Sequence, residues 1–192
     1  PKTGFLIGKG LGDHGFPMQA ISVLNPLEPD LKDNTEYWET VFTLASSSGM
    51  RDSLFKAAEN LYRLNNDNRA YMNNYAAMLL SERKNPETAI SLTYELMTRD
   101  KEVNIAAVIN HALALVLNQR FNEAVDYMKK VPIEKLPAEL VPGYNMAWFE
   151  IAYRIKDYDT AREYGLKVDV DKLLPGDKVW YEETWGTLKA EQ

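Results

Sequence analysis

A recurrence of about 35 residues constrains the fold of this chain more than any other feature. Small or aliphatic residues recur with steps of 34, 35, 35 and 37, at Ala20, Leu54, Ala89, Ala124 and Ala161. Seven residues after each of them stands another apolar residue: Leu27, Leu61, Leu96, Val131 and Val168. A spacing of seven places two residues on one face of a helix. A repeat of this length is typical of a solenoid whose helical units stack to bury their apolar faces.

Residues 105–131 show most clearly what one repeat contains. An apolar stripe at i, i+3, i+4 and i+7 predicts a first helix, with Val108, His111, Ala112 and Leu115 on its inner face. A second stripe follows, made by Phe121, Ala124, Val125, Met128 and Val131. Because only a few residues separate the stripes, the two helices must fold back as an antiparallel pair.

The repeat resembles the tetratricopeptide repeat (TPR), which has a Leu-Gly pair in its first helix and Ala-x3-Phe in its second. By residue class, the first element appears as Ile7/Gly8, Val41/Phe42, Tyr75/Ala76, His111/Ala112 and Trp148/Phe149. The second appears as Ala20/Leu24, Leu54/Ala58, Ala89/Thr93, Ala124/Met128 and Ala161/Gly165. Trp38 stands where the family has its tryptophan. The resemblance implies an all-α, right-handed superhelical solenoid of antiparallel helix pairs.

The resemblance divides the chain into residues 1–34, a degenerate first repeat, residues 35–175, TPR-like repeats, and residues 176–192, a C-terminal capping helix. Together they are expected to form a single domain within a longer chain. Each glycine in a helix interior costs roughly 1 kcal/mol relative to alanine, and the first expected helix holds Gly4, Gly8, Gly10, Gly12 and Gly15. We therefore predict that this helix is frayed or depends on further chain.

The same glycines support a rival interpretation. Gly10, Gly12 and Gly15 match Gly-x-Gly-x-x-Gly, the phosphate-binding turn of dinucleotide-binding enzymes. This interpretation makes the chain a fragment of a nucleotide-binding enzyme. It requires a strand at residues 5–7 and a helix from about Met18, with a second parallel strand that the sequence does not offer.

Composition excludes several classes of function. The formal charge of −6 opposes binding to nucleic acid, and no apolar run is long enough to cross a membrane. With no cysteine and two histidines, the sequence predicts no metal site and no cofactor. No side chains form a catalytic constellation, so we expect a protein that is not an enzyme. Its localisation is left open.

The outward faces of the first helices are the predicted binding surface. In residues 105–117, an apolar set points away from the second helix, which requires a cover: a peptide, a partner protein, a second copy in a homodimer, or a neighbouring repeat. Asn-x-Ala recurs at Asn74, Asn110 and Asn145, and resembles the asparagine ladder that holds peptide backbones in some TPR proteins. We predict a non-catalytic module for protein or peptide binding. Its groove is predicted to comprise Asn73, Asn74, Ile109, Asn110, Leu113, Val116, Leu117 and Met146, with Tyr153 and Arg154 at the rim.

Two further features bear on the ligand. The basic residues with which some TPR proteins clamp a terminal carboxylate are not matched, because the corresponding positions hold Glu39, Ala106 and Asn110. Aromatic residues in the last third of the chain raise the alternative of carbohydrate or small-ligand binding on exposed rings. These residues are Trp148, Trp180, Tyr181 and Trp185.

Overall fold

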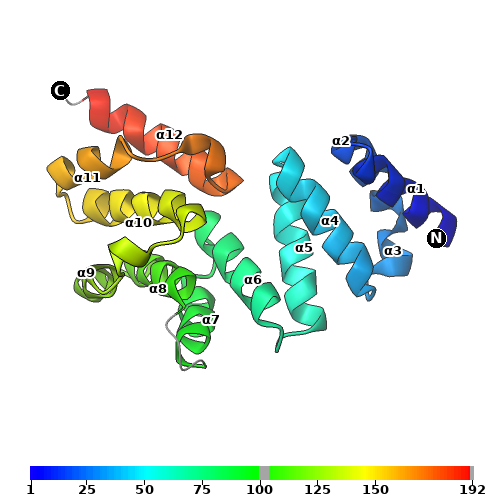
Figure 1. Cartoon of the computed structure of the whole chain (residues 1–192), viewed down its shortest axis with the longest axis horizontal. Coiled ribbons are helices and arrows are strands. Elements are labelled where there is room, and N and C mark those ends of the chain that lie inside the picture. Colours follow the sequence, from blue (N-terminus) through cyan, green and yellow to red (C-terminus); the bar gives the residue numbers. More distant parts are fainter. Residues whose placement is uncertain (100–103, 191–192) are drawn as a thin grey trace. The chain divides into compact units, whose positions relative to one another are not determined.

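The fold was analysed in a computed structural model that describes residues 1–99 and 104–190 (Figure 1). Every regular element in these ranges is a helix, and consecutive helices pack as antiparallel pairs. The predicted all-α fold of helix pairs is therefore confirmed. The chain divides into two compact units, Pro1–Met78 and Leu79–Gln192, which are described separately below. The single domain expected from the sequence stays a prediction.

The first unit contains two helix pairs and the start of a further helix. Helix α1 (Lys2–Asp13) packs on α2 (Pro17–Leu24), and α4 (Thr35–Ser48) packs on α5 (Arg51–Leu64). Between the pairs lie a short 3-10 helix, η1 (Asn25–Leu27), and α3 (Glu28–Leu31). Helix α6 (Arg69–Ser81) begins in this unit and ends in the next.

Helix α1 is continuous despite its glycines, so the prediction of a frayed first helix is wrong. A Cβ atom at Gly8 would lie 2.6 Å from Leu24 Cδ2, and one at Gly12 would lie 2.5 Å from Leu44 Cδ2. Such distances are too short for carbon atoms, so a larger residue would have to displace the Leu24 or Leu44 side chain or shift α1 itself. The two glycines permit close helix packing, which offsets their poor helix propensity.

The phosphate-binding turn is not formed. Gly10 and Gly12 lie inside α1, and only Gly15, with a φ of +82°, lies in the turn that follows. The predicted strand at residues 5–7 is part of the same helix. The interpretation as a dinucleotide-binding loop is therefore wrong: the glycines serve packing in a helix.

The second unit continues the pairing. Helices α7 (Pro86–Thr98), α8 (Ile105–Leu117) and α9 (Phe121–Lys129) pack in sequence, and α8 also packs on α10 (Val141–Arg154). Helix α10 then pairs with α11 (Tyr158–Gly165), which packs on α12 (Pro175–Ala190). Short 3-10 helices connect the others: η2 (Ile133–Lys135), η3 (Ala138–Leu140) and η4 (Val170–Lys172). The predicted capping helix corresponds to α12, and its residues 191 and 192 lie outside the described residues.

The recurring residues of the sequence lie at the helix contacts. Ala20, Ala89, Ala124 and Ala161 are fully buried, and Leu54 is 2% exposed. Side-chain caps start four of the described helices. Asn34 accepts from the backbone N–H of Tyr37, Asn68 from that of Tyr71, Asn104 from that of Ala107, and Asp157 from that of Thr160.

Candidate functional site

A groove between α1 and α4 is the first candidate site. It encloses about 360 Å³, within the size range of ligand pockets. It is lined by residues of the two helices: Lys9, Gly12, Asp13, Glu36, Glu39, Thr40, Thr43, Leu44 and Ser47. We call it the α1–α4 groove. Four of its α4 residues follow helical spacing, at Glu36, Thr40, Thr43 and Ser47, on the face opposite the buried Trp38 and Val41.

Charges in the α1–α4 groove are mostly acidic. One lysine, Lys9, faces three carboxylates, those of Asp13, Glu36 and Glu39. Lys9 Nζ lies 2.7 Å from Glu36 Oε1, and this hydrogen bond raises the pKa of Lys9. Both side chains are about half exposed, so the pair contributes little to stability and can open when a ligand binds.

The Glu39 carboxylate is held in place by a neighbouring helix. The hydroxyl of Tyr71, in the part of α6 that belongs to the first unit, donates a hydrogen bond of 2.5 Å to Glu39 Oε1. This hydrogen bond raises the pKa of Tyr71 to about 12. Glu39 thus reaches the groove with one oxygen engaged and its position fixed before any ligand binds.

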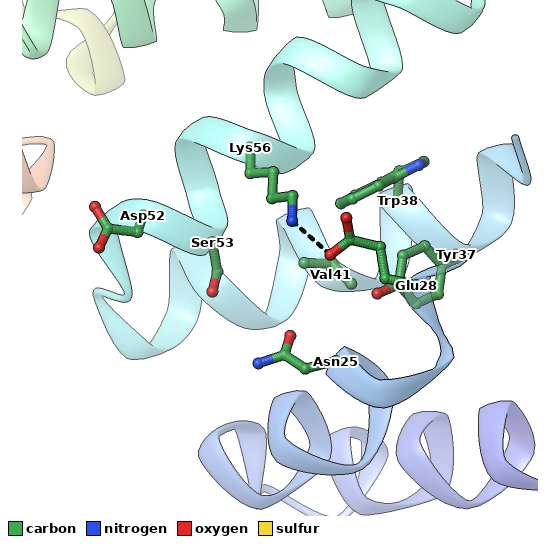
Figure 2. Close-up of a pocket in the computed structure, with 8 residues that line it drawn as sticks. All are labelled: Asn25, Glu28, Tyr37, Trp38, Val41, Asp52, Ser53 and Lys56. Atoms are coloured by element: carbon green, nitrogen blue, oxygen red, sulfur yellow. Dashed lines mark hydrogen bonds and ion pairs between the residues drawn. The ribbon is translucent and has the colours of Figure 1, made fainter. Parts of the chain in front are cut away.

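A second cleft in the same unit lies beside the connection from α2 to α4 (Figure 2). It encloses about 320 Å³ and is lined by Asn25, Glu28, Tyr37, Trp38, Val41, Asp52, Ser53 and Lys56. The cleft exists because α2 ends at Leu24, before Pro26, and leaves space beside α4 and α5. The Lys56 ammonium closes one side by bonding Glu28 at 2.5 Å, as Figure 2 shows.

The aromatic residues of this second cleft have structural roles. Trp38 and Tyr37 are each 1% exposed. Trp38 Nε1 donates to the carbonyl oxygen of Lys32 at 2.8 Å, which fixes the connection to the helix that follows. Burial raises the pKa of Tyr37 to about 12. A ligand in this cleft would therefore meet its polar rim and little of the rings.

A buried charge cluster is the third candidate, in the second unit. The Arg83 guanidinium donates to Glu150 Oε2 at 2.6 Å and to Asp177 Oδ1 at 2.7 Å, and also lies 4.8 Å from the centre of the Trp180 ring. Arg154 donates to the other oxygen of Glu150 at 2.9 Å. Burial raises the pKa of Asp177 to about 6, although Arg83 opposes the shift.

Perturbed carboxyl groups often mark functional sites, but the geometry here indicates a structural role. The cluster joins the end of α6 to α10 and to the first turn of α12, and the N–H of Asp177 also donates to Ser81 Oγ at 3.0 Å. Only 3% of the Glu150 side chain is exposed. The ion pairs therefore fix α12 in place and offer little surface to a ligand.

The groove predicted over residues 105–117 is largely internal. Ile109, Val116 and Met146 are 4%, 1% and 2% exposed, so their predicted place on a binding surface is wrong. Ile109 and Val116 belong to the core that α8 forms with α9 and α10. A neighbouring helix supplies the cover that the apolar face requires. The chain itself covers most of this face. The homodimer stays a prediction.

The remaining predicted residues lie partly in contact with solvent. Leu113 packs on the same core and is half-buried, as are Leu117 and Asn110. Asn73 and Asn74 lie in α6, in the first unit, whereas the residues of α8 and α10 lie in the second. Asn145 Nδ2 donates to the carbonyl oxygen of Lys167 at 3.0 Å, so one member of the expected asparagine ladder is used within the fold.

The predicted rim residues are engaged in the second unit. The Tyr153 ring lies 6.0 Å from the Trp180 ring, and Arg154 is bound to Glu150. The aromatics proposed for carbohydrate also pack inward: Trp148 stacks on Tyr164, and Trp185 stacks on Tyr181. This packing accounts for their helical spacing, although Trp148, Trp180 and Trp185 are half-buried and not fully covered. Carbohydrate binding stays an alternative prediction.

Sequence reasoning missed the α1–α4 groove because it sought apolar and amide side chains. The signal was present in α4, where polar residues recur at i, i+4, i+7 and i+11 opposite the tryptophan. Within residues 1–99 and 104–190, no group of His, Asp and Glu side chains has the arrangement of a metal site. Nor does any described helix combine the length and the hydropathy needed to span a membrane.

Solved structures resemble this chain, and three of them illustrate the likeness. PilW, described as a widely conserved type IV pilus biogenesis factor, is 12% identical with a TM-score of 0.57, and the match covers 99% of this chain and 90% of PilW. MamA from Desulfovibrio magneticus RS-1, from residue 41 to its end, is 16% identical with a TM-score of 0.58 and coverages of 86% and 91%. The MamA RS-1 ArsTM double mutant is 14% identical with a TM-score of 0.58 and coverages of 97% and 96%.

These structures are TPR-like helical solenoids, so the fold of this chain is TPR-like. At such low identity the likeness concerns the fold alone. No protein-family model matches the sequence, and no curated protein matches it.

Proposed function

We propose that this chain, with its TPR-like fold, is a non-catalytic protein-interaction module that binds an extended polypeptide segment in the α1–α4 groove. The observation that carries the proposal is the groove itself, which encloses about 360 Å³ and is lined by side chains of two first helices. The described residues offer no comparable arrangement for a reaction, since their strongly coupled charges lie in the buried cluster around Arg83.

The groove fits a peptide better than a small molecule. Seven of its nine lining residues have polar side chains, which are exposed or half-buried, and those of α4 follow one another along one face of that helix. Small-molecule pockets are mostly apolar and enclosed, whereas an extended chain brings its own backbone N–H and C=O groups to polar walls. Asn74, in the same unit as the groove, stays a proposed secondary contact, and the half-buried Asn110, Leu113 and Leu117 stay a separate predicted contact surface of the second unit.

Selection of short random peptides displayed on phage tests this proposal. The wild-type chain is compared with Thr43→Trp, which fills the groove, and with Thr187→Trp as a matched control. Both threonines are exposed, both lie in helices, and each donates its hydroxyl proton to the carbonyl oxygen four residues earlier. We expect Thr187→Trp to enrich the same peptides as the wild type and Thr43→Trp to lose them. Equal enrichment by all three proteins would show that binding occurs elsewhere.

A further inference from the structure

Side chains of the α1–α4 groove present hydrogen-bond acceptors almost exclusively. The hydroxyls of Thr40 and Thr43 donate to the carbonyl oxygens of Glu36 and Glu39, at 2.8 and 3.0 Å, and Ser47 donates to that of Leu44 at 3.0 Å. A hydroxyl has one proton, so these three oxygens can offer a ligand only their lone pairs. The carboxylates of the groove are acceptors as well.

The donor capacity of the groove is small and partly in use. Lys9 is the one cation among the residues that line it, and its ammonium bonds Glu36. The groove therefore holds a charge of −2 from one lysine and three carboxylates. Glu39 is oriented by the hydrogen bond from the Tyr71 hydroxyl.

We infer that the segment bound in the α1–α4 groove is cationic, with an arginine or lysine side chain that bonds the carboxylates of the groove, Glu39 above all. This inference rests on the proposed function. A ligand for this groove must supply donors, and positive charge complements the surplus of carboxylates. Because Glu39 is fixed before binding, less conformational freedom is lost when a guanidinium or ammonium group bonds it.

A peptide array tests the charge of the bound segment. Each position of a short peptide is held in turn as Arg, Lys, Gln, Glu or Leu, with the other positions randomised. The full chain is compared with an Asp13→Asn/Glu39→Gln variant and with a Glu182→Gln/Glu183→Gln control. Both double variants remove two negative charges, and the control residues are exposed on α12. Thermal melting confirms that each variant is folded.

We expect the wild type to retain peptides with Arg or Lys at one or two positions about fivefold more than peptides with Gln there, which corresponds to one exposed ionic contact. The preference should persist in the control, disappear in the groove variant and weaken with added salt. Enrichment of Glu would mean that Lys9 binds an anion, and would overturn the inference. So would binding that Thr43→Trp abolishes but that shows no charge preference; both results leave the proposed function intact. If the wild type retains no peptide at all, the proposed function fails and the inference fails with it.

Discussion

Removal of the Arg83 charge is expected to destabilise the second unit by about 3 kcal/mol. Methionine is the informative replacement, since Arg83→Met keeps an unbranched stem beside Trp180 while it removes the guanidinium. The variant leaves two carboxylates with fewer partners, those of Glu150 and Asp177, whose side chains are 3% and 17% exposed. Breaking a buried pair typically costs 3–5 kcal/mol. We expect the lower end of that range because Arg154 still bonds Glu150.

The free-energy cost of Arg83→Met is decided by how deeply the charges are buried and not by the distance between them. Lys167 lies 2.6 Å from Glu163, which equals the distance from Arg83 to Glu150, but its side chain is 49% exposed and that of Glu163 is 61% exposed. Lys167→Met in the same unit is therefore the matched control, with an expected cost of at most about 1 kcal/mol.

The free-energy cost of Arg83→Met also depends on pH, and the protonation of Asp177 decides whether this cost grows or shrinks as pH falls. The pKa of this carboxyl is raised to about 6 in the folded protein, above its ordinary value of 3.8. The folded state therefore keeps the proton as pH falls below about 6, and Arg83 then loses its ionic partner on α12. The difference between the wild type and Arg83→Met should accordingly be largest above pH 6 and should shrink below it.

Urea unfolding with hydrogen exchange and mass spectrometry measures these effects in α10 and α12. At pH 7.5 we expect a clear loss of protection in both helices for Arg83→Met and little change for Lys167→Met. At pH 5 the loss should be smaller. Equal effects of the two variants, or a cost of Arg83→Met that grows as pH falls, would refute the reasoning from burial.

Two further predictions concern other parts of the chain. In α1, Gly8→Ala should lower the melting temperature, since its Cβ would meet Leu24 at 2.6 Å, whereas Gly10→Ala, with nothing within 4 Å of its Cβ, should stabilise by about 1 kcal/mol; a gain from Gly8→Ala would contradict the close packing. In α8, burial lowers the pKa of His111 below 6.5, so the unfolded chain binds its proton first and stability should fall as pH drops below about 6.5. Calorimetry of His111→Gln should show a smaller loss of stability between pH 7 and pH 5 than in the wild type. An unchanged dependence of stability on pH would exclude this role of His111.

The helix pairs were predictable because their signal lies in spacing alone. Small residues such as Ala124 recur where two backbones approach, and their complete burial follows from the geometry of an antiparallel pair. The contact between helices is local in sequence, so one stripe of seven or eight residues specifies it. The same argument located α9 and α11 correctly, although α11 is only 8 residues long.

Which face of α8 meets solvent was not predictable in the same way. Both of its faces are apolar, and periodicity shows that a face needs a cover without showing what provides it. In the structure α8 packs on α7, α9 and α10, so Ile109 and Val116 are covered by the chain itself. Contacts with three neighbours depend on how successive helix pairs stack. The apolar stripe within one helix does not predict this stacking.

The glycines of α1 connect the packing of the first unit to its groove. Gly12 lines the α1–α4 groove and also touches Leu44, where a Cβ would lie 2.5 Å from Leu44 Cδ2. The absence of a side chain at this position lets α1 approach α4 closely enough for Lys9 to bond Glu36 across the groove. A larger residue at this position would have to displace the Leu44 side chain, which lines the groove as well. A glycine that lowers the helix propensity of α1 therefore also forms part of the proposed binding site, so packing and groove shape depend on the same position.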